Sequence, residues 1–198
     1  RSIALTAATG DAFLGSNSSA TTISIQGENV GFSDLLSSGG ITLNATSGDL
    51  VGTGPGDLTA GNAIDLDATG SIAFGLLSTT RAITADAGGN ISFTSAVGES
   101  VRFNAGGDIS GGDIDASNDT LTSNVAVLNA GGSVTSGTIN AVDGIDITGG
   151  GDVVVDALIG GFTDILTTGA VDIGSADILR LEAQGSSISL GTANITSN

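Results

Sequence analysis

The chain has 198 residues, 33 of them glycine, and its 21 acidic against four basic residues give a formal net charge of −17. It contains no Cys, His, Met, Trp, Tyr or Lys, which excludes a disulfide framework and a thiolate metal site. A nucleic-acid partner or an anionic membrane surface would need cationic side chains that the chain lacks, and no apolar run approaches the ~18 residues of a membrane-spanning helix.

A stretch of alternating apolar and polar residues, ending in a small residue and a glycine turn, recurs about every nineteen residues. In chain order, its ten copies begin at Ile3, Ile23, Ile41, Ile64, Ile83, Val101, Ala126, Ile145, Thr163 and Leu179. A fixed period of this length is typical of a stacked solenoid. The coils must stack, because one copy buries too few side chains to offset its loss of conformational entropy.

Three short strands are expected in each coil. In the first, positions one, three and five face inward, position three being mostly Leu, Ile or Phe and position five mostly Ala or Gly. A second strand follows the turn, as at Ile72, Ile91 and Val134, and a fainter third strand includes Ile114 and Ile139. With no helical periodicity, the pattern predicts an all-β, parallel β-helix of about ten coils. Residues 1–198 form a single segment of it, which we expect to belong to a longer array.

The fourth position of each copy faces outward and is mostly polar. Its column runs Thr6, Gln26, Asn44, Asp67, Asp86, Asn104, Asn129, Thr148, Leu166 and Glu182. Stacked Asn side chains bonding along a solvated face are one interpretation. The alternative is a weak cation site at Asp67 and Asp86, which Arg102 could neutralise from the diagonal position instead. In the second-position column we expect Asp164 and Arg180 to be neighbours.

Two coils are longer than the others, and insertions in a solenoid form loops that often lie on the binding face. The coil from Ile41 contains a glycine-rich turn at 52–56, which lacks the lysine of a phosphate-binding loop. The coil from Val101 contains Asp113, Asp115 and Asp119. Solvated carboxylates are the favoured interpretation, and Ca²⁺ binding on this acidic loop is a weaker alternative because no EF-hand pattern is present.

Enzymatic activity is not expected. The chain lacks His, Lys and Tyr, which removes most general acid–base candidates, although a paired-carboxylate hydrolase remains an alternative. We therefore assign no catalytic, cofactor-binding or metal-binding residue, and no cofactor.

Several runs resemble the repeats of filamentous haemagglutinin-type exoproteins and related bacterial surface β-helices. They read VRFNAGGDISGGDIDA, VLNAGGSVTSGTINA and IDITGGGDVVVDA. The resemblance implies a right-handed β-helix, export across a Gram-negative outer membrane, and adhesive or structural work. The secretion domain of that family is not recognisable in this chain.

The predicted function is a non-catalytic structural rod segment of an extracellular bacterial adhesin or surface filament. Expected partners are the flanking repeats of the same chain or another copy stacked end to end, and cell-surface glycans or proteins. Nucleic-acid binding and membrane insertion are not expected. The alternative is a module that binds a glycan, a cation or a protein partner through the loop of the long coil at 101–125.

Overall fold

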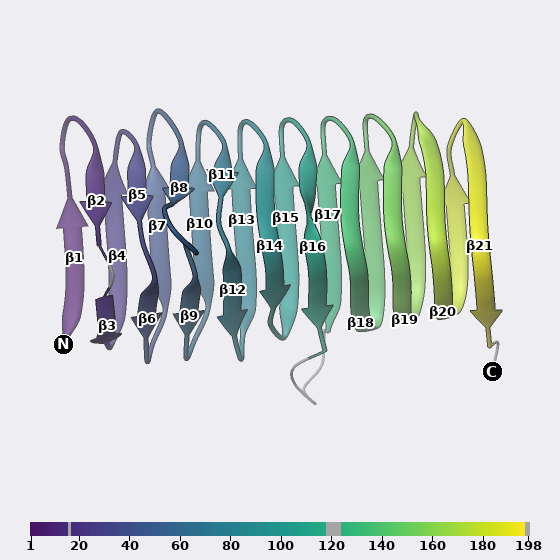
Figure 1. The fold of residues 1–198 in the computed structure, drawn as a ribbon, viewed down its shortest axis with the longest axis horizontal. Helices are drawn as coiled ribbons and strands as arrows, with labels where there is room; N and C mark the ends of the chain where they lie inside the picture. Colours follow the sequence, from purple (N-terminus) through teal and green to yellow (C-terminus); the bar gives the residue numbers. More distant parts are fainter. Residues whose placement is uncertain (16, 118–123, 197–198) are drawn as a thin grey trace.

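The computed structural model describes residues 1–15, 17–117 and 124–196. These residues form 21 β-strands in one parallel sheet and no helix. The sheet winds through about ten turns of ~19 residues, which confirms the predicted β-solenoid. In Figure 1 the turns lie side by side along a rod, each with one rising strand and one falling path, and the two termini lie at opposite ends.

The rising strands are the most regular elements, because each is an alternating segment whose apolar positions point into the solenoid. They are β1 (Ser2–Thr6), β4 (Thr22–Gly27), β7 (Ile41–Ala45), β10 (Ile64–Ala68), β13 (Ala82–Ala87), β15 (Ser100–Ala105) and β17 (Val125–Ala130).

The falling path changes along the rod. In the first four turns it consists of two short strands, which gives the three strands per coil that the sequence predicts. These pairs are β2 (Ala12–Leu14) and β3 (Asn17–Ala20), β5 (Val30–Phe32) and β6 (Leu35–Ser37), β8 (Leu50–Gly52) and β9 (Leu58–Ala60), and β11 (Ile72–Ala73) and β12 (Leu76–Thr79). Later the two merge into β14 (Ile91–Val97) and β16 (Ile109–Ala116).

Towards the C-terminal end the falling strand also continues round the bend into the next rising strand. The long strands that result are β18 (Val134–Gly149), β19 (Val153–Thr167) and β20 (Ala170–Gln184), and β21 (Ser187–Ile195) follows them. Figure 1 shows these strands as nearly continuous ribbons, so the coils become more regular towards the C-terminus.

The predicted alignment of the copies is confirmed for all starts except the last. Thr163 pairs with Leu181 rather than with Leu179, and Asp164 pairs with Glu182. The sequence Leu179-Arg180-Leu181 offers two alternating starts, and pairing selects the second. Because this shift is two residues, each side chain keeps its predicted face.

The core is a continuous apolar column between the rising and falling strands. Inward residues at the third position, such as Leu66, Leu128 and Ile147, are fully buried, as predicted. Phe74 and Phe103 belong to coils that are separated by the coil of Ala85, yet their ring centroids are only 5.9 Å apart. The methyl side chain of buried Ala85 therefore leaves room for aromatic rings from the coils on both sides.

Glycine at the turn after the rising strand is required by coil stacking. A Cβ atom on Gly88, Gly106 or Gly131 would lie 2.2 Å from a carbonyl oxygen of the preceding coil, closer than any real contact. The same backbone nitrogens donate hydrogen bonds of 2.9 Å to Ala68, Ala87 and Ala105 respectively. Because the turn follows the same path and makes the same hydrogen bond in these coils, there is no space for a side chain at these glycine positions.

The inward register predicts that Leu128→Asp will strongly destabilise the protein, because it buries a charge without a partner in the apolar column. We expect a loss above the about 2–5 kcal/mol of a buried Leu→Ala change, measured as the free energy of unfolding in urea. The control is Thr148→Asp, which places the same side chain on the exposed face of the sheet. Equal stability of the two variants would contradict the register.

Candidate functional site

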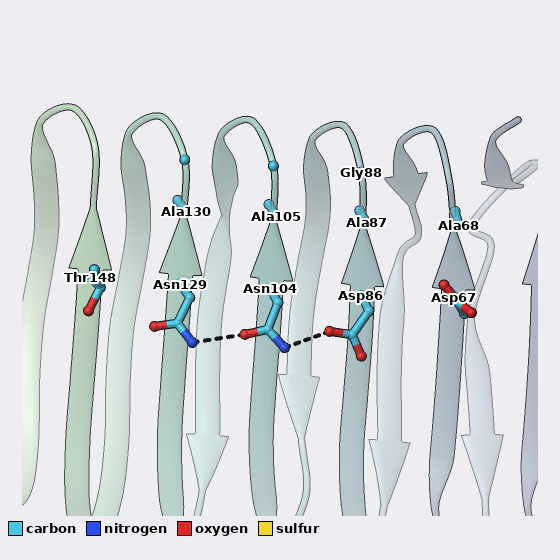
Figure 2. Close-up of a pocket in the computed structure, with 12 residues that line it drawn as sticks. Asp67, Ala68, Asp86, Ala87, Gly88, Asn104, Ala105, Asn129, Ala130 and Thr148 are labelled. Carbon is cyan, nitrogen blue, oxygen red and sulfur yellow. Dashed lines mark hydrogen bonds between the residues drawn. The ribbon is translucent and has the colours of Figure 1, made fainter.

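The candidate site is a row of polar side chains on the outer face of the rising strands. We call this set the polar row: Asp67 on β10, Asp86 on β13, Asn104 on β15, Asn129 on β17 and Thr148 on β18. Successive members are direct register partners on neighbouring coils. Figure 2 shows that they lie side by side in a row, in the order in which the coils stack.

The centre of the polar row is a hydrogen-bonded chain. Asn129 Nδ2 donates to Asn104 Oδ1 at 2.8 Å, and Asn104 Nδ2 donates to Asp86 Oδ1 at 2.6 Å (Figure 2). Stacked strands favour such amide ladders because identical side chains repeat at the strand spacing. The predicted stacking of Asn side chains is therefore confirmed, and the ladder ends on the carboxylate of Asp86.

A shallow groove of about 510 Å³ runs beside the polar row. Its other residues are small, because the fifth position and the turn glycine of each coil come next along the chain; they are Ala68, Ala87, Gly88, Ala105, Gly106, Ala130 and Gly131. The amide and carboxylate groups thus lie beside a surface formed by alanine and glycine residues. The ionisable groups in the lining of the groove are the carboxylates of Asp67 and Asp86.

The N-terminal end of the polar row concentrates negative charge. Asp67 and Asp86 are direct register partners on adjacent coils, as predicted. Partial burial, then the charge of Asp86 and then that of Asp67, raise the pKa of nearby Asp65 above its ordinary value of 3.8. Arg102 pairs with Thr84 and is diagonal to Asp86, but among the described residues no ion pair joins it to this carboxylate.

The predicted contact of Arg180 with Asp164 exists, although the predicted pairing is wrong. Arg180 pairs across the sheet with Phe162, because of the register of the last coil. Its Nη2 lies 2.7 Å from Glu182 Oε1 and 3.8 Å from Asp164 Oδ1, so it reaches Asp164 on the diagonal. Glu182 consequently stands in the second-position column rather than in the fourth.

A second set of polar residues, which sequence reasoning missed as a structural element, lines the turn before each falling strand. In this turn ladder, a side-chain oxygen of each coil accepts the backbone N–H of the next. Its members are Asn29, Asp49, Ser71, Asn90, Asp108, Ser133 and Asp152, with bonds of 2.7–3.1 Å that end on the N–H of Ala170.

The acidic loop residues that can be placed serve a similar purpose. Asp113 Oδ1 accepts the N–H of Thr138 at 2.7 Å, and Asp115 Oδ1 accepts the N–H of Ser117 at 3.1 Å. Asp119 lies outside the described residues. Among those described, no group of three or more carboxylates is arranged to hold a metal ion. Asp113 and Asp115 therefore add no support for Ca²⁺ binding to this loop, because their carboxylates accept hydrogen bonds from backbone N–H groups.

Comparison of the chain with protein-family models, with curated proteins and with solved structures gives no match. The resemblance to haemagglutinin-type repeats is therefore compatible with the β-solenoid fold but rests on the residues alone. Within the described part of the chain, no helix is present that could span a membrane.

The raised pKa of Asp65 predicts that Asp65→Asn stabilises the protein at neutral pH. A carboxyl whose pKa is higher in the folded than in the unfolded state lowers stability above the folded value, and this cost disappears as the pH falls below 3.8. We expect a gain of about 0.2–1 kcal/mol at pH 7, the range of a cross-strand charge effect. Thermal melts at pH 7 and pH 3 test it; a gain that persists at pH 3 would assign the effect to packing instead.

The turn ladder predicts that Asp108→Ala destabilises the protein by about 1–2 kcal/mol, because the N–H of Ser133 loses its acceptor. Asp108→Asn is the matched control, since the carboxamide oxygen can accept the same bond without the charge. Urea unfolding of both variants separates the two effects. Equal losses would show that charge, rather than the hydrogen bond, matters at this position.

Proposed function

We propose that this chain is a structural rod segment of an extracellular bacterial adhesin or surface filament. The observation that carries the proposal is the unbroken pairing of coil with coil from β1 to β21, which makes the segment one continuous object. Ten coils at the ~4.8 Å strand spacing give a rod about 48 Å long. The resemblance of its repeats to haemagglutinin-type exoproteins supports the bacterial surface as its location.

A non-catalytic role is part of the proposal. In the polar row, the Asn104 amide is already bonded to Asn129 and to Asp86. Among the described residues, no hydrogen bond joins the hydroxyl of Thr148 to a carboxylate that could act as its base. The carboxylates of the turn ladder accept hydrogen bonds from backbone N–H groups of the next coil, so they stabilise the stacking of the coils. These acidic residues thus support the shape of the rod.

The proposed partners include further coils, either from flanking repeats of the same chain or from another copy. The outer edges of β1 and β21 present unpaired backbone groups, which are a template for pairing with another strand. Ile188 and Ile195 on β21 are about half exposed, whereas the equivalent residues of inner coils are buried. A stacked coil would cover them. Glycans or proteins of a cell surface remain the proposed partners for the outer faces.

A second candidate function is a binding module that uses the long coil at 101–125. The specific observation is that the two ends of its loop are fixed to the rod. Ala116 pairs with Ala141, and the N–H of Asn124 donates to Asp143 Oδ2 at 2.8 Å. Such an anchored insertion can display a binding sequence without disturbing the coils. Residues 118–123 lie outside the described part of the chain.

Surface location tests the rod proposal. Antibodies raised against the purified chain are expected to label intact cells of the source organism in immunogold electron microscopy, along thin projections. A cytoplasmic protein should be probed in parallel and stay unlabelled until the cells are permeabilised. Labelling of this chain only after permeabilisation would contradict the proposal.

Deleting residues 118–123 separates the rod from the binding module. The deletion leaves two residues between Ala116 and Val125, as between their register partners Ala141 and Gly144, so the coil takes the length of the next one. We expect the melting temperature to change by no more than a few degrees. If the loop is a binding site, retention of the protein on glycan arrays and cultured cells will be lost; a rod segment will behave as before.

A further inference from the structure

An exposed aromatic ring lies on the outer side of the falling path near the N-terminal end. Phe13 of β2 is 59% exposed although it belongs to a strand. Its register partner on β5 is Gly31, and a Cβ atom there would lie 2.7 Å from Phe13 Cδ2, so the ring covers the glycine. Val51 of β8, 40% exposed, follows in the next coil. Figure 1 shows β2, β5 and β8 as neighbours in successive turns.

Carboxylates flank this apolar stripe. Asp11, Asn29 and Asp49 are the turn residues directly before β2, β5 and β8, two positions before Phe13, Gly31 and Val51. The six residues line one shallow pocket of about 340 Å³. Asn29 Nδ2 donates to Asp11 Oδ1 at 2.8 Å, and its Oδ1 accepts the N–H of Asp49. The amide is therefore engaged, and so is one oxygen of each carboxylate, because Asp49 Oδ1 accepts the N–H of Ser71. The polar atoms that remain for a ligand are mainly the second oxygens of Asp11 and Asp49.

A similar combination of groups holds a guanidinium elsewhere in the same chain. At the other end of the rod, Phe162 is 56% exposed and carries Arg180 over its ring, with the guanidinium carbon 5.7 Å from the ring centroid. Asp164 and Glu182 hold that guanidinium by ion pairs. Phe13 has a comparable ring and two comparable carboxylates, but within the described residues no cation lies over it.

We infer that the Phe13 pocket receives an arginine side chain of a basic polypeptide partner. A guanidinium has five N–H donors and no acceptor, which matches a pocket whose free polar atoms are acceptors. Its flat face stacks on aromatic rings, whereas an ammonium group is a hydrated point charge. A saccharide hydroxyl both donates and accepts hydrogen bonds, so it matches a pocket with few free donors less well than a guanidinium does. The net charge of −17 favours the approach of a basic chain over long distances.

The test is a titration of the wild-type protein with a peptide of alternating glycine and arginine, followed by NMR of the aromatic ring signals. The chain has six phenylalanines and no other aromatic residue, and the Phe13→Leu variant assigns the signal of interest. We expect the Phe13 signal to shift and saturate, and the equivalent lysine peptide to bind more weakly. Phe13→Leu should weaken binding about two- to five-fold.

Matched controls separate the pocket from the general acidity of the surface. Asp11→Asn removes a pocket carboxylate, and Asp172→Asn removes an exposed carboxylate from β20. We expect the first to weaken binding of the arginine peptide more than the second. An unmoved Phe13 signal, or equal effects of the two Asp variants, would overturn the proposal. Should Phe13→Leu fail to fold, through-bond NMR experiments on the isotope-labelled wild-type protein assign the Phe13 signal instead, and the titration and the Asp pair still decide.

Two other occupants are distinguished by the same spectra. If the Phe13 signal shifts with protein concentration in the absence of peptide, and sedimentation velocity shows association, another copy of the chain covers the ring and the proposal is wrong. A shift produced by a neutral oligosaccharide at lower concentration than the peptide would equally overturn it. A response to the arginine peptide alone supports it.

Discussion

The parallel register between coils is the constraint on which the rest of the molecule depends. Every coil must follow the path of its neighbours closely enough for backbone hydrogen bonds to form along the whole rod. The side chain that fits at a given position therefore depends on the atoms that lie one coil away. Turn glycines such as Gly106 show this most directly, because the space for a side chain is occupied by a carbonyl oxygen of the preceding coil. The aromatic group around Phe93 shows the same dependence in the core, since rings from three coils share one space.

Acidic residues in this protein have two different tasks. Asp49, Asp108 and Asp152 hold backbone N–H groups across coils, which explains why a solenoid with few cations tolerates so many carboxylates. Asp65 lies on the outer sheet instead, where partial burial, then the charge of Asp86 and then that of Asp67, raise its pKa. Net charge alone therefore says little about where this surface is available for binding.

Sequence periodicity was sufficient for the fold and for the polar row. Inward and outward faces follow from alternation, and the stacking of Asn104 on Asp86 follows from alignment of the copies. The last register was not predictable, because Leu179 and Leu181 fit an alternating pattern equally well and only pairing through β20 decides between them. The turn ladder had a signal: each turn places Asn, Asp or Ser before the next apolar strand, as at Asn90. Its partner atom lies one coil away, however, and only the structure reveals it. The exposure of Phe13 likewise depends on packing that no local pattern records.

The turn ladder also gives the rod a direction. Between Asn29 and Ala170, each coil offers a side-chain oxygen to the coil on its C-terminal side, and its own backbone N–H binds the oxygen of the coil on its N-terminal side. The two faces of such a coil are therefore complementary to each other and not to themselves. A two-fold symmetric contact, in which the same face meets its own copy, would place acceptor against acceptor along this edge. Within the rod, the contact between neighbouring coils is therefore heterologous, and it repeats along one axis without closing.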